Sequence, residues 1–170
     1  MADRKIKTHR RAIYPGSFDP ITNGHLDILD RVRPFFDEVV VVVAGSSRKD
    51  PFFTPAERVE LIRDVVSDRP GVKVDIWPGL IMDYASKHGY SAVIRGLRAA
   101  SDFEYEFMMA AMNKEINPEV ETLFMMTSQR LFFVSSSMIK ELFDYGGDIS
   151  PYVPPSVLRR LDRKRKERKR

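Results

Sequence analysis

The sequence predicts an α/β fold in which a five-stranded, doubly wound parallel sheet is covered by helices on both faces. Two observations support this. Short apolar segments alternate with segments of helical periodicity along the chain, as they do when crossover helices join parallel strands. Residues 39–44 form a continuous, valine-rich apolar run, which is typical of a central strand buried on both faces.

The remaining elements are assigned in chain order. Strands are expected at residues 12–14, 39–44, 72–77, 92–95 and 122–126. Helices are expected at residues 26–32, 55–67, 81–88, 101–116, 135–145 and 155–170. Two of them begin with a capping box, Thr54 to Glu57 and Ser101 to Glu104. We see no internal repeat and no linker, so we expect one domain.

Composition narrows the class of protein. The chain has 170 residues, of which 43% are hydrophobic and 31% charged, as in an ordinary soluble domain. It contains no cysteine, which excludes disulfides and thiolate metal sites. The longest apolar run is too short to span a membrane, and the N-terminus lacks the apolar stretch of a signal peptide. We therefore expect a soluble cytoplasmic protein.

The net charge of +4 is unevenly distributed along the chain. Residues 159–170 carry +7 and residues 3–11 carry +4, which leaves −7 for residues 12–158. We accordingly divide the chain into a basic N-terminal extension (1–11), a folded domain (12–158) and a basic C-terminal helix or tail (159–170). Such ends can contact RNA or an anionic surface. Solvated ends are the simpler interpretation, so no nucleic-acid partner is expected.

The expected helix at 101–116 is apolar on more than one face. Phe103, Phe107, Met108 and Met112 do not fall on a single stripe. Part of this surface can serve the core, but the excess suits a contact between subunits. We therefore expect a homo-oligomer.

The segment from Tyr14 to His25 is the strongest functional signal. It joins the first expected strand to the first helix through a turn that contains Gly16 and Ser17. Backbone N–H groups at such a turn, together with the positive end of the helix dipole, favour bound phosphate. His25 lies in the first helical turn, where its ring can donate a hydrogen bond to the same anion.

Other polar groups follow the expected strands at the same sheet edge, where parallel sheets bind ligands. They are residues 46–49, which include Lys49, residues 95–98, and residues 127–137. Arg95 follows a buried strand and precedes Gly96, so its guanidinium should emerge at the strand mouth and bind phosphate. The serines at 135–137 begin a helix and can either bind an anion or simply cap the helix.

These residues carry a resemblance to a known family. Thr22-x-Gly24-His25 is similar to the T/H-x-G-H signature of a nucleotidyltransferase superfamily, and residues 134–140 (Val-Ser-Ser-Ser-Met-Ile-Lys) are similar to its late serine motif. Residues 14–20 (Tyr-Pro-Gly-Ser-Phe-Asp-Pro), 95–98 (Arg-Gly-Leu-Arg) and 102–106 (Asp-Phe-Glu-Tyr-Glu) resemble the bacterial phosphopantetheine adenylyltransferases. The similarity covers residues 12–158.

The resemblance implies a Rossmann-like nucleotidyltransferase fold and the transfer of AMP from ATP to 4′-phosphopantetheine, giving dephospho-coenzyme A and pyrophosphate. It implies that His25 stabilises charge on the α-phosphate. The substrate-binding residues it implies are Ser17, Lys49, Ile81 and Arg95. The ATP-binding residues it implies are Ser17, Phe18, His25, Gly96, Leu97, Arg98, Glu106, Leu131, Phe132, Phe133, Val134, Ser135, Ser136 and Ser137. It also implies a homohexamer and feedback by coenzyme A.

The expected mechanism is a direct in-line attack that needs no general base, because a phosphate monoester is mostly dianionic at pH 7. Mg²⁺ should arrive with ATP, since no dedicated carboxylate cluster for a metal is visible. Two kinds of alternative remain. One is a related transferase, acting on nicotinate mononucleotide or on an alcohol phosphate. The other is a non-catalytic module that binds nucleotide or RNA through its basic ends.

Overall fold

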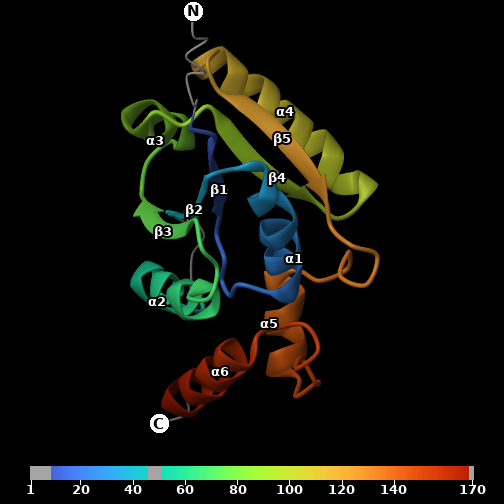
Figure 1. Cartoon of the computed structure of the whole chain (residues 1–170). Helices are drawn as coiled ribbons and strands as arrows, with labels where there is room; N and C mark the ends of the chain where they lie inside the picture. The colour runs from blue at the N-terminus through green and yellow to red at the C-terminus, as the bar shows by residue number, and fades with distance from the viewer. Residues whose placement is uncertain (1–8, 46–50, 169–170) are drawn as a thin grey trace, which may run out of the picture.

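Five parallel strands form one sheet in the order β3-β2-β1-β4-β5 in the computed structural model (Figure 1). The structure describes residues 9–45 and 51–168. The strands are β1 (Arg11–Gly16), β2 (Glu38–Ala44), β3 (Val72–Trp77), β4 (Ala92–Leu97) and β5 (Glu121–Met126). The order reverses between β1 and β4, and the carboxyl ends of those two strands are where a doubly wound sheet binds ligands.

The two faces of the sheet have separate cores because successive side chains of a strand point to opposite sides. On one face, Val39, Val41 and Val43 of β2 pack in a cluster with residues of α1 (Asn23–Val32) and α2 (Pro55–Val66). On the other face, Val40 and Val42 pack with residues of α3 (Ile81–His88). The valine run is therefore buried on both sides, as predicted.

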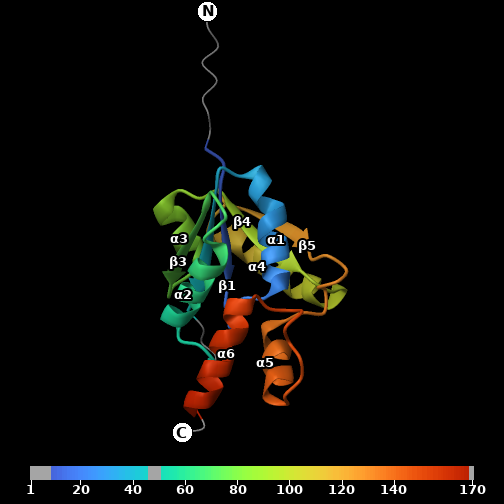
Figure 2. The same cartoon turned by 60° about the horizontal axis from the view of Figure 1, so that its bottom comes forward.

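Three further helices follow β4 in the chain, and one short connection lies between α1 and β2. These helices are α4 (Ala100–Ile116), α5 (Ser136–Asp144) and α6 (Pro155–Arg168), and the connection is the 3₁₀ turn η1 (Arg33–Phe35). The ring of Phe103 on α4 contacts that of Phe124 on β5 at 6.2 Å between centroids. In both views α5 and α6 lie beyond the carboxyl edge of the sheet (Figures 1 and 2). There α5 contributes Ser136, Ser137 and Lys140 to the wall of the site.

The predicted fold class is confirmed, and each predicted strand is present within two residues of its expected bounds. The capping box predicted at Thr54 is also present, with Thr54 and Glu57 bonded reciprocally. The helix α6 crosses the predicted boundary at residue 158, and Leu161 within it is fully buried in the core. None of the helices in the described ranges is long and apolar enough to cross a membrane.

The capping box predicted at the start of α4 is wrong. The helix begins at Ala100, and Ala99 occupies the N-cap position without a side-chain hydrogen bond. Asp102 is used differently, because its carboxylate accepts from the backbone N–H of Arg98 at 3.3 Å and from the Arg98 Nε at 3.1 Å. A charged partner one turn earlier therefore replaces the expected cap.

Candidate active site

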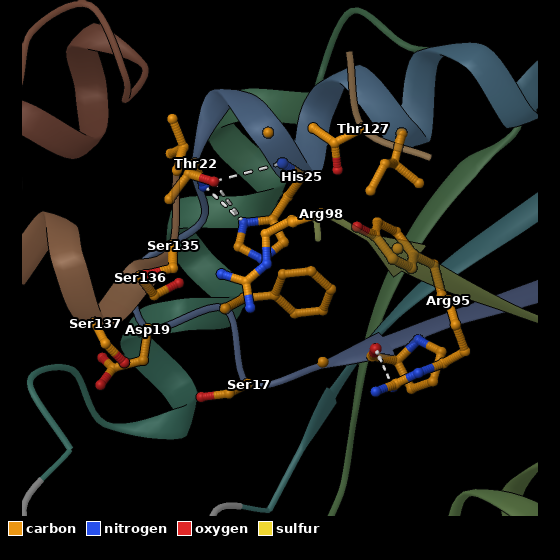
Figure 3. A pocket seen from close by; sticks show the side chains of 18 of the residues that line it. Ser17, Asp19, Thr22, His25, Arg95, Arg98, Thr127, Ser135, Ser136 and Ser137 are labelled. Carbon is orange, nitrogen blue, oxygen red and sulfur yellow. Dashed lines mark hydrogen bonds between the residues drawn. The ribbon is translucent and has the colours of Figure 1, made fainter. Parts of the chain in front are cut away.

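A cavity of about 430 Å³ opens at the carboxyl edge of the sheet, between the ends of β1 and β4 (Figure 3). The first turns of α1 and α5 close it from the sides. Its wall is rich in groups that bind phosphate. The polar residues that line it are Ser17, Asp19, Thr22, His25, Arg95, Arg98, Thr127, Ser135, Ser136, Ser137 and Lys140.

The turn after β1 forms the floor of the cavity. Phe18 has a φ of +48°, a left-handed conformation that costs a non-glycine residue about 1–3 kcal/mol. Its ring packs edge-on against Tyr14 and His25. A Cβ on Gly16 would lie 2.9 Å from the Phe18 ring, so glycine is required for this packing. The turn is therefore held in one conformation by the rings around it.

The His25 ring is oriented by the N-terminus of α1. Thr22 is the N-cap residue, and its backbone N–H donates to His25 Nδ1 at 3.0 Å. Because Nδ1 accepts this bond, the proton of the neutral ring is on Nε2, which can donate to a ligand. Burial and the positive charge of Arg98 lower the pKa of His25 to about 4. The ring is thus a neutral hydrogen-bond donor at pH 7.

Two arginines from β4 and the residue after it are each held by an acidic side chain of α4. The Glu106 carboxylate accepts from Arg95 Nε and Nη2, both at 2.6 Å. Arg95 Nη1 donates to the Pro15 carbonyl at 3.2 Å. Burial opposes the charge of Arg95, but the bonds to Glu106 outweigh it and raise the pKa. Asp102 holds Arg98 in the same way, so both cations are positioned before any ligand binds.

The three serines at the start of α5 have different partners. The Ser135 hydroxyl caps the helix by accepting from the Met138 N–H at 3.1 Å, and the Ser136 hydroxyl donates to the Pro20 carbonyl at 2.8 Å. The Ser137 hydroxyl has no hydrogen-bond partner among the described residues. One serine therefore caps the helix, and Ser137 is available to a ligand.

Asp19 and Lys140 form an ion pair in the cavity wall, with Nζ 2.9 Å from Oδ2. The Asp19 carboxylate also accepts from the backbone N–H groups of Phe52 and Phe53, at 3.0 and 2.8 Å. Burial would raise the pKa of Asp19, but these bonds outweigh it and lower the pKa. The carboxylate therefore stays charged and joins the turn, the segment before α2, and α5.

Comparison with known proteins agrees with this arrangement. The family model described as "Cytidylyltransferase-like" matches residues 13–142. The phosphopantetheine adenylyltransferase of Heliobacterium modesticaldum is 54% identical over 153 residues, covering 90% of this chain and 91% of that protein. The protein of the same name from Thiobacillus denitrificans is 51% identical over 156 residues, covering 92% and 98%. The chain belongs to the phosphopantetheine adenylyltransferase family.

Many of the residues to which the resemblance assigns a role line one cavity in this family member. They come from three separate segments of the chain. These residues are Ser17, Phe18, His25, Arg95, Gly96, Arg98, Val134, Ser135, Ser136 and Ser137. A Cβ on Gly96 would lie 2.3 Å from the Ile28 Cδ1 of α1, so a larger residue there would force the Ile28 side chain to move.

Other predicted residues lie elsewhere. Glu106 binds Arg95 and does not line the cavity. Leu97 is buried, and its carbonyl accepts from Thr127. The predicted Lys49 lies outside the described residues. Four other predicted ligand-binding residues also lie outside the cavity wall. Ile81 is at the start of α3, Leu131 packs against the core, and Phe132 and Phe133 are exposed. The ligand contacts of these residues stay predictions.

Sequence reasoning assigned no role to Asp19 or Arg58, which the structure places at the base of the turn. A signal for Arg58 was present. It shares the helical spacing of Leu61, Ile62 and Val65, the apolar stripe of α2. A charged residue on such a stripe is buried and needs partners, which here are backbone oxygens of the site.

Proposed function

We propose that this family member transfers AMP from ATP to 4′-phosphopantetheine. One phosphate oxygen of 4′-phosphopantetheine forms a bond to the α-phosphorus of ATP, while the bond from that phosphorus to the α,β-bridging oxygen breaks. The products are dephospho-coenzyme A and pyrophosphate, which leaves with the electron pair. The observation that carries this proposal is the single cavity that collects His25, Arg95 and Arg98 at the β1–β4 switch point.

His25 acts in this proposal as a neutral donor. Its Nε2–H would bind a nonbridging oxygen of the α-phosphate, where negative charge grows in the transition state. The first turn of α1 adds the positive end of its dipole. No proton has to move, because the attacking phosphate is already dianionic near pH 7. Positioning and charge stabilisation are therefore sufficient.

The basic side chains of the site bind different substrates in this proposal. We assign Arg95, with the predicted Lys49, to the phosphate of 4′-phosphopantetheine, and Arg98 to ATP. Glu106 and the Pro15 carbonyl occupy three of the five N–H groups of Arg95, which leaves two for a phosphate. We assign Ser137 and the N-terminus of α5 to the outer phosphates of ATP.

Mg²⁺ would enter bound to ATP, where it neutralises phosphate charge. Among the described residues, Asp19 is the only carboxylate that lines the cavity, and both of its oxygens already accept hydrogen bonds. Mg²⁺ usually binds through one or two carboxylates plus substrate phosphates. This donor set fits a metal that is held mainly by the nucleotide, with little contribution from protein oxygens.

Self-association through α4 is a further part of the proposal. The apolar side chains on its outer surface are Phe103, Tyr105, Phe107, Met108, Met112 and Ile116, each at least 47% exposed. A second copy of the chain would cover them. The hexameric state, feedback by coenzyme A and a cytoplasmic location are proposed on the family resemblance alone.

The decisive experiment measures pyrophosphate release from ATP and Mg²⁺ with three acceptors: 4′-phosphopantetheine, nicotinate mononucleotide and glycerol 3-phosphate. We expect release with the first only. His25→Ala should lower kcat by about 10²–10³-fold, the usual effect of removing one transition-state donor, while ATP still binds. His88→Ala, which changes an exposed histidine on α3, serves as the matched control. Unchanged turnover in His25→Ala would contradict the mechanism.

A non-catalytic nucleotide- or RNA-binding role makes a different prediction. Binding would then survive the loss of His25 and weaken steeply with added salt. The basic helix α6 offers limited support for this role, because Lys164 is bonded to Glu57 and Arg160 lies 3.5 Å from Glu60. Part of its charge is thus neutralised within the fold.

A further inference from the structure

Arg58 is a buried cation beneath the phosphate turn. Its side chain, on the first turns of α2, has no exposed surface. Nε donates to the Phe53 carbonyl at 2.8 Å, and Nη1 donates to the Ser17 carbonyl at 3.2 Å. Nε also lies 3.6 Å from Asp19 Oδ1. One guanidinium therefore connects α2 to both sides of the turn that follows β1.

The burial of this cation is costly. Taking a charged side chain out of water costs several kcal/mol even after relaxation, and a buried donor without a partner adds to that cost. Arg58 Nη2 is buried and has no hydrogen-bond partner in the part of the chain that the structure describes. An apolar side chain would fill this space at lower cost. The guanidinium must therefore supply something that packing alone does not.

The hydrogen bond from Arg58 fixes the orientation of the peptide group between Ser17 and Phe18. Arg58 donates to the Ser17 carbonyl but does not line the cavity, from which we infer that this carbonyl points away from the cavity. In a trans peptide the carbonyl and the next N–H point in opposite directions. The N–H of Phe18 is consequently directed to the cavity side, where Ser17 and Phe18 both line the wall.

Two properties of Phe18 indicate that its backbone N–H is held in place and is free to donate to a ligand. Its backbone is in the left-handed region, which persists only when the surroundings enforce it. Its N–H donates no hydrogen bond to any described residue, although the side chain is almost fully buried. Backbone N–H groups near a cavity are usually bonded to protein, water or ligand. A phosphate oxygen would satisfy this one.

We propose that Arg58 is a positioning residue for adenylyl transfer, which holds the Ser17–Phe18 peptide so that the Phe18 N–H donates to a phosphate of the bound nucleotide. This inference rests on the proposed function and on the ATP contact of Phe18 that the family resemblance implies; its new element is the role of Arg58. Arg58 itself does not touch the substrate. It acts through the Ser17 carbonyl.

Steady-state kinetics of Arg58→Lys and Arg58→Met test the proposal. Lysine keeps the charge but cannot bind two separated carbonyls in the planar geometry of arginine. We expect kcat to fall about tenfold in Arg58→Lys and about a hundredfold in Arg58→Met, with the KM for ATP changing much less. Arg63→Lys and Arg63→Met, at an exposed position of the same helix, should match the unchanged chain. A lower unfolding temperature with unchanged kcat and KM would show a structural role only and overturn the proposal.

A second measurement needs no folded variant of Arg58. The full chain is labelled with ¹⁵N-phenylalanine, and the Phe18 amide is identified by its loss in Phe18→Tyr. We expect a downfield shift of its proton when Mg²⁺–ATP is added. An unshifted resonance at saturating nucleotide would overturn the proposal. This result is independent of the acceptor, so failure of the chain to use 4′-phosphopantetheine would reject the proposed function and leave the donor assignment intact.

Discussion

The carboxylate of Glu106 accepts two hydrogen bonds from the guanidinium of Arg95, from Nε and Nη2, with both N–O distances at 2.6 Å. The two residues belong to different elements, α4 and β4. Bidentate pairs of this kind fix the plane of an arginine as well as its charge. The orientation of Arg95 towards the cavity is therefore set by a residue that does not line the cavity.

Glu106→Gln should weaken the binding of 4′-phosphopantetheine. The amide keeps one acceptor oxygen but loses the charge, so Arg95 is held by one bond where it had two. Hydrogen bonds to charged groups contribute about 1.5–3 kcal/mol, and we expect the KM for 4′-phosphopantetheine to rise about tenfold or more. Glu104→Gln changes an exposed residue of the same helix and should have no effect. An unchanged KM in Glu106→Gln would mean that Arg95 needs no support from α4.

The protonation state of His25 gives a second prediction. Its pKa of about 4 means that the ring carries no charge at neutral pH. A ¹⁵N NMR titration should show the His25 nitrogens changing below pH 5, with Nε2 protonated and Nδ1 unprotonated at pH 7. A His25 midpoint near 6.5 would contradict the neutral-donor mechanism.

Substitution at His25 extends this test to catalysis. Asparagine is neutral and offers an N–H donor, whereas alanine offers none. His25→Asn should therefore retain more turnover than His25→Ala at pH 7. Equal loss in both variants would indicate that the ring acts by something other than hydrogen bonding.

The sequence was most informative where periodicity and local capping decide structure. The alternation of residues 39–43 between two cores and the capping box at Thr54 follow from local rules, and both are present. The cap predicted at Ser101 is absent because α4 begins at Ala100, with Ala99 at the N-cap, and Asp102 is bonded to Arg98. That contact depends on the path of the chain leaving β4, which the local pattern does not contain.

In the candidate site, too, features set by local sequence were predicted and contacts between distant elements were not. Among the described residues, those that follow β1, β4 and β5 lie at one edge as predicted, since the carboxyl ends of parallel strands meet there. The supporting contacts were not predicted: Arg58 and Asp19 were given no role, and Glu106 was expected to contact ATP. These side chains bond to residues 11 or more positions away in the sequence. Such pairings become visible only when the helices are placed against the sheet.

Gly96→Ala should destabilise the chain through contact with one atom. The new Cβ would lie 2.3 Å from Ile28 Cδ1, and overpacking of this kind costs about 1–3 kcal/mol. Ile28→Val removes that methyl group. The double variant should therefore be more stable than Gly96→Ala alone, although Ile28→Val by itself costs about 0.5–1.5 kcal/mol. Urea unfolding of the three variants measures this coupling, and additive losses would contradict the steric explanation.

The apolar surface of α4 predicts self-association. Met108 is 62% exposed and Phe107 57%, so a charged side chain at Met108 would lie within any contact made by this helix. Met108→Lys should weaken assembly by about thirtyfold or more, the effect of losing a strong interface contact. Sedimentation velocity compares it with Phe35→Lys, which changes an equally exposed residue of η1. Identical sedimentation of both variants would place the subunit contact elsewhere.

Glu38 predicts how stability depends on pH. Burial would raise the pKa of its carboxyl, but hydrogen bonds from Lys73, Arg11 and Tyr90 outweigh this and lower the pKa to about 2. Between pH 4.5 and 2 the unfolded chain therefore binds this proton more readily than the folded chain, and the free energy of unfolding falls as the pH is lowered. The contribution of Glu38 is complete above pH 4.5.

Comparison with Glu38→Gln isolates this contribution from the other acidic groups. At pH 7 the variant should be less stable by on the order of 2–3 kcal/mol, from a shift of 1.36 kcal/mol per pKa unit reduced by solvent screening. The difference should shrink as the pH falls towards 2. Urea unfolding at several pH values measures it, with Glu60→Gln, at a position 69% exposed, as control. A difference that stays constant from pH 7 to pH 2.5 would show that the Glu38 pKa is not lowered by folding.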